Sequence, residues 1–171
     1  MIHYIHDDIT KSQCDIICHQ VNCQGVMNSG VAKAIREKWP EVYEQYREDY
    51  EYAVMNNHPM LGNLSICTRT KDGKIIVNMF AQEFYGYSGQ KFTSYDAFWS
   101  CLMRIKQWVK DDQTLAFPLK IGSDRGGAKW PVIRTMIEQA LYDKEVYIYY
   151  LNEWDLDNED RRKAGPHSNE L

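Results

Sequence analysis

The chain has 171 residues, of which 44% are hydrophobic, and its formal net charge is −4. This length suffices for one domain with a sizeable core and is short for two ordinary domains. The acidic balance argues against a surface that follows a nucleic-acid backbone, and no stretch approaches the length needed to cross a membrane. The segment Met1–Asp8 lacks the basic start and apolar run of a signal peptide, so we expect a cytoplasmic protein without a membrane partner.

The cysteines are odd in number, and most lie in apolar patterns where a free thiol packs as a small hydrophobic group: Cys14, Cys18, Cys23, Cys67 and Cys101. This usage fits a reducing compartment. Three of them cluster around His19, but their spacing matches no usual zinc pattern, and successive strand residues point to opposite faces. We therefore expect no metal site.

The first half of the chain predicts two strands and two helices. Residues 2–5 form a short strand, and β-branched residues within 14–21 predict a second one. A polar, glycine-bearing loop over 22–30 follows. Apolar residues at helical spacing then cover 31–38, and Pro40 suits the first turn of another helix that runs to about Asn57.

The second half continues the alternation of strands and helices. Two runs rich in Ile and Val, 64–70 and 74–80, flank Asp72-Gly73 and predict an antiparallel hairpin. The elements expected after it are a helix over 95–109 capped by Thr93 or Ser94, a strand over 115–119, a helix over 131–142 and a strand over 145–151.

Strands that alternate with helices indicate an α/β fold, a three-layer α/β/α sandwich with a mixed central sheet. We expect one domain over residues 1–154. Residues 155–171 are polar, carry both charge signs and contain Gly165-Pro166, so we expect a flexible C-terminal tail there.

Two strand–loop–helix segments are the most informative feature of the sequence. One runs from Ile17 to Trp39, and the other from Leu115 through the glycines of 121–130 to Leu141. Each places unpaired backbone N–H groups at the start of a helix, where they can hold a phosphate, and two such sites suit a diphosphate. Neither loop is a P-loop or a dinucleotide fingerprint, and each alone is also typical of a plain strand-to-helix turn.

The ordered set of Asp8-Ile9-Thr10, Asn22, Gly25–Ala32 and Gly122–Trp130 resembles the macrodomain family over roughly residues 1–151. The resemblance implies that ADP-ribose or a derivative is the ligand, that Asp8 accepts from the adenine amine and that Asn22 meets the distal ribose. The ligand-binding residues implied are Asp8, Ile9, Thr10, Asn22, Gln24, Asn28, Ser29, Gly30, Val31, Ala32, Ile121, Gly122, Ser123, Asp124, Arg125, Gly126 and Gly127.

The segments Val77–Gln82 and Phe92–Phe98 resemble the branch that contains ADP-ribose 1''-phosphate phosphatases and compact ADP-ribosyl hydrolases. Some hydrolases of that branch use a lysine where this chain has Ala81–Glu83. Phosphatase-like relatives use a histidine on the second strand and an aspartate in the second glycine loop, which His19 and Asp124 match in type. The catalytic residues implied are His19, Asp124 and Asn22, although a strand histidine and a loop aspartate also have plain structural uses.

The favoured function at this stage is a metal-independent hydrolase without a cofactor, an ADP-ribose 1''-phosphate phosphatase. One alternative is a hydrolase that removes ADP-ribose from a modified protein or nucleic acid, and another is a module that binds ADP-ribose without turnover. An unrelated alternative is an enzyme with a cysteine nucleophile. We expect a monomer that meets nucleic acid only when that nucleic acid is ADP-ribosylated.

Overall fold

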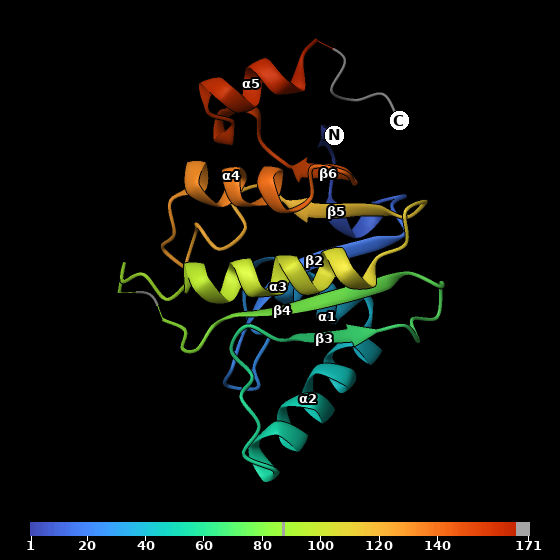
Figure 1. The fold of residues 1–171 in the computed structure, drawn as a ribbon, viewed down its shortest axis with the longest axis vertical. Helices are drawn as coiled ribbons and strands as arrows, with labels where there is room; N and C mark the ends of the chain where they lie inside the picture. Colours follow the sequence, from blue (N-terminus) through green and yellow to red (C-terminus); the bar gives the residue numbers. More distant parts are fainter. Residues whose placement is uncertain (87, 167–171) are drawn as a thin grey trace.

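The computed structural model describes residues 1–86 and 88–166. Its six strands form one sheet in the order β1-β6-β5-β2-β4-β3, in which β3 is antiparallel to β4 and the other pairs are parallel (Figure 1). The strands are β1 (Ile2–His6), β2 (Ile16–Asn22), β3 (Leu64–Cys67), β4 (Ile75–Gln82), β5 (Thr114–Pro118) and β6 (Glu145–Tyr150).

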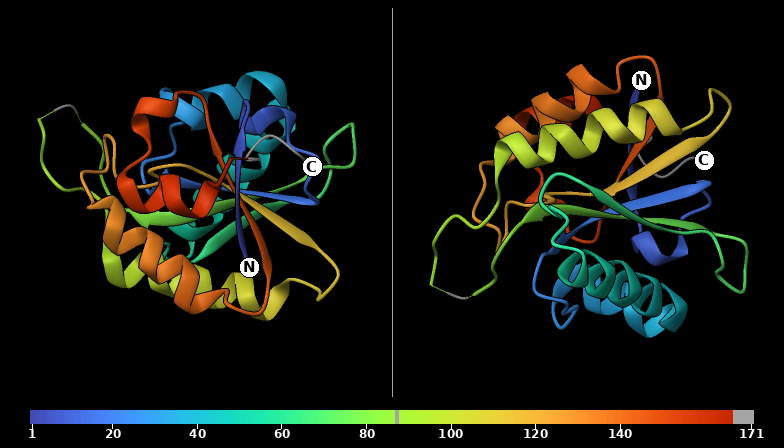
Figure 2. Two further views of the ribbon diagram at one scale, coloured as in Figure 1. Left: turned by 90° about the horizontal axis from the view of Figure 1, so that it is seen from above. Right: turned by 60° about the horizontal axis from the view of Figure 1, so that its bottom comes forward.

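Helices cover both faces of the sheet and give three layers, as the right-hand view of Figure 2 shows. One face packs against α1 and α2, and the other against α3 and α4. The helices are α1 (Gly30–Lys38), α2 (Pro40–Met55), α3 (Tyr95–Trp108), α4 (Trp130–Ala140) and α5 (Asn158–Ala164), with short 3₁₀ turns η1 (Ile9–Lys11) and η2 (Glu153–Asp155). The predicted α/β/α sandwich with a mixed sheet is confirmed.

Local chemistry sets several of these boundaries. Pro40 opens α2 directly after α1 ends, where its missing N–H costs no hydrogen bond. The Ser94 side chain accepts from the amide of Ala97 and caps α3, which decides between the two caps that the sequence allowed. The Asp72-Gly73 turn joins β3 and β4 as an antiparallel hairpin, as predicted.

The topology gathers three loops at one edge of the sheet. Because β2, β4 and β5 are parallel, the chain leaves all three strands at the same edge (Figure 1). The neighbours β2 and β5 continue into helices on opposite faces, α1 and α4. A crevice at such a switch in strand order is where open α/β sheets bind ligands.

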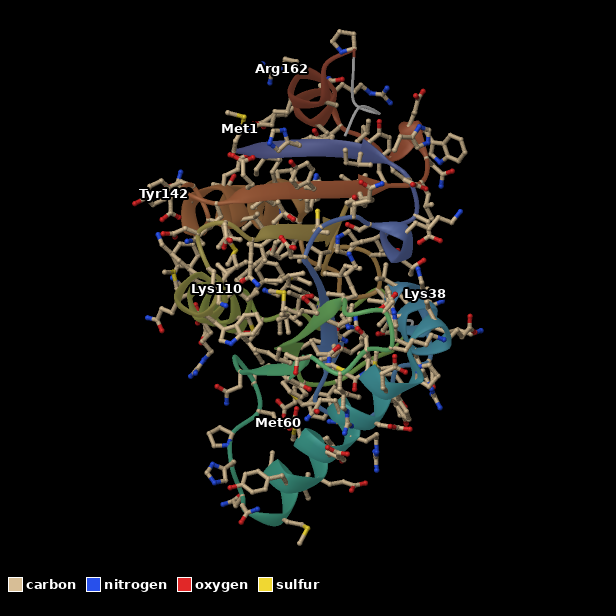
Figure 3. All side chains as sticks on the ribbon, turned by 90° about the vertical axis from the view of Figure 1, so that its right-hand side faces the viewer. Met1, Lys38, Met60, Lys110, Tyr142 and Arg162 are labelled. Carbon is tan, nitrogen blue, oxygen red and sulfur yellow. The ribbon has the colours of Figure 1, made fainter. Side chains whose placement is uncertain are left out.

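The C-terminal segment corrects one sequence-based expectation. Residues 158–164, expected to be part of a flexible tail, form α5 beside β1, where Figure 3 places Arg162. Asp160 is fully buried and accepts hydrogen bonds from the Tyr4 hydroxyl (2.7 Å), the Trp130 indole and the Arg134 guanidinium (2.8 Å). A charged residue of the segment that was expected to be a tail therefore attaches α5 to the rest of the domain through buried hydrogen bonds and an ion pair. Residues 167–171 of the expected tail lie outside the described residues.

Within the described residues, no helix combines the length and apolarity that crossing a membrane requires.

Candidate functional site

A cavity of about 250 Å³, called here the distal cavity, opens beyond the carboxyl ends of β2 and β5. Its wall combines residues of β2, the first turn of α1 and the loop after β5. The members that carry polar or charged side chains are His19, Gln20, Asn22, Asn28, Ser29, Gln82, Tyr85, Lys120, Asp124 and Arg125.

A second cavity of about 490 Å³, called here the proximal cavity, adjoins the first. It is lined by Asp8 and Ile9 at the start of η1, by Tyr149 and Tyr150 of β6, and by residues 151, 152 and 155. The wall that the two cavities share consists of Gly30, Val31, Pro118, Leu119, Lys120 and Asp124. They therefore form two ends of one cleft, divided by the start of α1 and the loop after β5.

The start of α1 presents backbone N–H groups at this dividing wall. The Ser29 side chain makes no capping hydrogen bond, and the first backbone bond of the helix runs from Lys33 N to Ser29 O (3.2 Å). Gly30 has a φ of +59°, and a Cβ there would meet nothing within 4 Å. The first-turn amides have no partner within the helix and carry a partial positive charge, so they suit an anion.

The loop after β5 is held by the chain just before α3. Thr93 Oγ1 donates to Gly122 O (2.7 Å), and the amides of Phe92 and Thr93 both donate to Gly126 O (2.8 and 2.9 Å). A Cβ on Gly126 would lie 2.3 Å from Thr93 Oγ1, so the close approach requires glycine. Gln20 Nε2 donates to Thr93 Oγ1 (2.8 Å) and ties this support to β2.

The loop after β2 is organised by Asn22 and a buried tyrosine of α2. Asn22 Oδ1 accepts from Gln24 N (3.0 Å), and Asn22 Nδ2 donates to Val26 O (3.0 Å). The Tyr46 hydroxyl lies 2.7 Å from Asn22 O and accepts from the amide of Gly25 (3.1 Å). Asn22 thus shapes the loop and still has one amide hydrogen for a ligand, because each NH₂ group offers two.

His19 is 1% exposed, although it belongs to the wall of the distal cavity. Its Nε2 lies 2.5 Å from Asn78 Oδ1, and its Nδ1 has no hydrogen-bond partner. Burial lowers the pKa of His19 to about 4 against the opposing effect of the Asn78 hydrogen bond. The imidazole is therefore neutral at physiological pH.

Asp8 lines the proximal cavity, and one of its two carboxylate oxygens accepts hydrogen bonds from Thr10. Its Oδ1 accepts from both the amide and the hydroxyl of Thr10, each at 2.9 Å, which fixes the carboxylate at the start of η1. The same side chain lines the cavity. An oriented carboxylate there provides an acceptor for an exocyclic amine.

Two kinds of known protein resemble this chain in sequence. No family model matches. The DNA ADP-ribosyl glycohydrolase of Mycobacterium tuberculosis is 27% identical over 154 residues, which are 87% of this chain and 42% of that protein. The ADP-ribose 1''-phosphate phosphatase of Scheffersomyces stipitis is 34% identical over 68 residues, 36% of this chain and 39% of that protein. The chain thus spans about two fifths of the length of these relatives.

Solved structures agree with the sequence matches. The macrodomain of Mycobacterium tuberculosis DarG matches with a TM-score of 0.72 at 22% identity, over 87% of this chain and 97% of that structure. The chain has the macrodomain fold. Thermosipho africanus DarTG in complex with ADP-ribose matches with a TM-score of 0.70 at 19% identity, over 86% of this chain and 41% of that structure. The family resemblance read from the sequence is confirmed.

Most of the ligand-binding residues predicted for this macrodomain line one of the two cavities, and three lie outside both linings. Thr10 is buried and bonded to Asp8, and Gln24 Nε2 donates to Glu83 O (3.2 Å). Gly127 packs against the chain before α3, where a Cβ would lie 2.8 Å from Gln90 O. These three residues shape the loops. The predicted catalytic residues His19, Asn22 and Asp124 all belong to the wall of the distal cavity.

The wall residues that the sequence prediction missed include Lys120 and Gln20. Lys120 lines both cavities, has a φ of +60°, and places Nζ 3.4 Å from Asp155 Oδ1. Left-handed backbone is uncommon for a residue other than glycine and often marks a functional position. Gln20 lines the distal cavity and holds Thr93. The position of Lys120 directly before the glycine loop was the available signal, whereas nothing in the sequence pointed to Gln20.

The cysteines give no support to the rival with a thiol nucleophile. All five are buried and free of disulfides. Burial raises the pKa of Cys23 and of Cys101 to about 12 and holds the pKa of Cys18 well above its usual value. A nucleophilic cysteine requires the opposite shift together with exposure. Within residues 1–86 and 88–166, no three His, Cys, Asp or Glu side chains are grouped to hold a metal ion.

Proposed function

We propose that this macrodomain binds ADP-ribose along the cleft and hydrolyses a bond at the distal ribose. The observation that carries the proposal is the shared wall, where uncapped α1 amides and the loop after β5 separate a larger cavity from a smaller one. ADP-ribose matches this shape, because its diphosphate joins a larger group, adenosine, to a smaller one, the distal ribose. The larger cavity, with Asp8 as acceptor, takes adenosine, and the smaller one takes the distal ribose.

The distal cavity contains groups suited to activate water. Asp124 belongs to its wall, and its carboxylate forms no ion pair with a described residue. His19 contributes a neutral imidazole, and Asn22 contributes an amide hydrogen. In the proposed reaction Asp124 accepts a proton from water, and the water oxygen bonds to the distal-ribose carbon as the bond from that carbon to its substituent breaks. The substituent leaves with the bonding electrons and takes up the proton that Asp124 then releases. Residues 81–83 contain no lysine, so a covalent lysine adduct at that position is not part of the proposal.

ADP-ribose 1''-phosphate is the substrate we favour, because a neutral histidine and an aspartate suffice for attack by water on a small ester. ADP-ribosylated DNA is the second candidate, since the matches that cover 87% of this chain are DNA ADP-ribosyl glycohydrolases. The net charge of −4 gives no general attraction to DNA, so recognition would depend on the ADP-ribosyl group.

Two product assays on the purified protein test the proposal. Release of inorganic phosphate from ADP-ribose 1''-phosphate supports the phosphatase, and release of ADP-ribose from modified DNA supports the second candidate. Asp124→Ala should abolish the activity and retain ADP-ribose binding. If ADP-ribose binds but neither substrate is turned over, the hydrolase proposal is wrong and the protein is a binding module. If ADP-ribose does not bind, the whole proposal is wrong.

A further inference from the structure

A line of buried polar side chains leads from the distal cavity across the face of the sheet to α2. His19 pairs with Asn78 on the neighbouring strand, and Asn78 pairs with Ser65 on the next one. His19, Asn78 and Ser65 are each at most 1% exposed. The line ends at Asp49 of α2, whose Oδ2 lies 2.6 Å from Ser65 Oγ.

The charged end of this line fixes the direction of every hydrogen bond in it. A carboxylate only accepts, so Ser65 Oγ donates its one hydrogen to Asp49. Ser65 Oγ can then only accept from Asn78, which turns Asn78 Nδ2 toward it (3.4 Å). The other end of the amide, Oδ1, therefore faces His19 Nε2.

The direction of the line determines the tautomer of His19. Since Asn78 Oδ1 is an acceptor, His19 Nε2 must carry the hydrogen. A neutral imidazole has one N–H group, and its other nitrogen bears a lone pair. Nδ1 is therefore a bare acceptor, and it is the ring atom that has no partner in the structure. A buried acceptor without a partner is costly and often marks a place where a ligand or water binds.

We propose that Asp49, Ser65 and Asn78 are positioning residues that hold His19 as the Nε2–H tautomer, so that Nδ1 accepts a hydrogen bond from a hydroxyl donor in the distal cavity. The hydroxyl donor is either the distal ribose or the attacking water. The inference rests on the proposed function for the identity of this donor, whereas the tautomer itself does not depend on any ligand.

Nitrogen-15 NMR of the ligand-free protein tests the tautomer, with the His19 signals assigned by comparison with His19→Gln. The wild type should show the hydrogen on Nε2. Asp49→Asn removes the carboxylate that sets the direction and should produce a mixture of tautomers, as should Ser65→Ala. Glu51→Gln, an exposed change of the same charge on the same helix, should leave the tautomer unchanged. A hydrogen on Nδ1 in the wild type, or an unchanged tautomer in both test variants, would overturn the proposal.

Titration with ADP-ribose tests the role of Nδ1. Saturation should shift the Nδ1 signal, and Asp49→Asn should lower the affinity about threefold to tenfold relative to Glu51→Gln, the range for one hydrogen bond. If the Nδ1 signal shifts only with a hydrolysable substrate, and Asp49→Asn binds ADP-ribose as tightly as Glu51→Gln does, the donor is the attacking water. Asp49→Asn should then lower kcat and leave the affinity unchanged. If ADP-ribose binds and turns over without changing the Nδ1 signal, this inference is wrong. If ADP-ribose does not bind, the proposed function fails and the tautomer result stands.

Discussion

Lys120 Nζ, on the wall that the two cavities share, lies 3.4 Å from Asp155 Oδ1 of the proximal cavity, and both side chains are about two fifths exposed. An ion pair this exposed contributes little to stability, so a bound anion can compete for the lysine at small cost. The left-handed backbone of Lys120 places it in the turn that closes this wall. In the proposed complex, the lysine leaves Asp155 and binds the diphosphate.

Lys120→Met should lower the affinity for ADP-ribose roughly tenfold, because a charge-assisted hydrogen bond to phosphate is lost. Lys110→Met is the matched control, since Lys110 is exposed in the loop between α3 and β5, at the other end of β5 from Lys120 (Figure 3). Asp155→Asn should not weaken binding. Calorimetry measures all three, and equal affinities for Lys120→Met and Lys110→Met would exclude contact between Lys120 and the ligand.

Asp8→Asn should weaken ADP-ribose binding about tenfold or more, because an amide N–H would face the adenine amine in place of an acceptor oxygen. The amide oxygen can still accept from Thr10, so η1 should remain intact. The hypoxanthine analogue of ADP-ribose presents an acceptor at the same position and should bind the variant relatively better. An identical preference for the two bases in wild type and variant would show that Asp8 does not select adenine.

His19 should make stability depend on pH. Its pKa is about 4 in the folded protein and 6.5 when unperturbed, so between these values the unfolded chain binds the proton more readily. The free energy of unfolding should therefore be retained above pH 6.5 and fall as the pH drops toward 4, by roughly 3 kcal/mol at about 1.4 kcal/mol per pKa unit. Urea denaturation at several pH values measures the slope, which should be shallower in His19→Gln. An equal dependence of the unfolding free energy on pH in the wild type and in His19→Gln would show that the His19 imidazole is not buried as the structure has it.

Asp160→Ala should lower the free energy of unfolding by about 2–4 kcal/mol, because the buried Tyr4 hydroxyl and Trp130 indole lose their acceptor, while Arg134 keeps its other two carboxylate partners. Lys163→Met breaks only half-exposed ion pairs on the same helix and should cost less than about 1 kcal/mol. Chemical denaturation compares the two. A small effect of Asp160→Ala would mean that α5 contributes little to the fold.

The sequence predicted the elements that obey a simple period or a strong turn signal. The antiparallel β3–β4 hairpin followed from Asp72-Gly73, and the break between α1 and α2 followed from Pro40. It did not predict α5, because the buried face of that helix is ionic. Asp160 is buried only by virtue of Tyr4, Trp130 and Arg134, which lie far away in the chain.

The sequence predicted the two glycine loops of the site, but it did not predict the contacts that the site residues make with neighbouring strands and loops. The glycine pattern located both loops, since close approach and positive φ restrict the residue type. It could not show that Gln24 turns toward Glu83 O, because that contact depends on the loop after β4. The setting of His19 was also hidden, since Asn78 and Ser65 stand opposite it only through strand register.

One ADP-ribose molecule should occupy both cavities with its diphosphate at the wall between them, and a crystal structure of the complex decides whether it does. In this complex, adenine should lie beside Asp8, phosphate oxygens should accept from the first-turn amides of α1, and the distal ribose should lie beside His19 and Asn22. Adenine in the distal cavity, or ligand density elsewhere on the molecule, would contradict it.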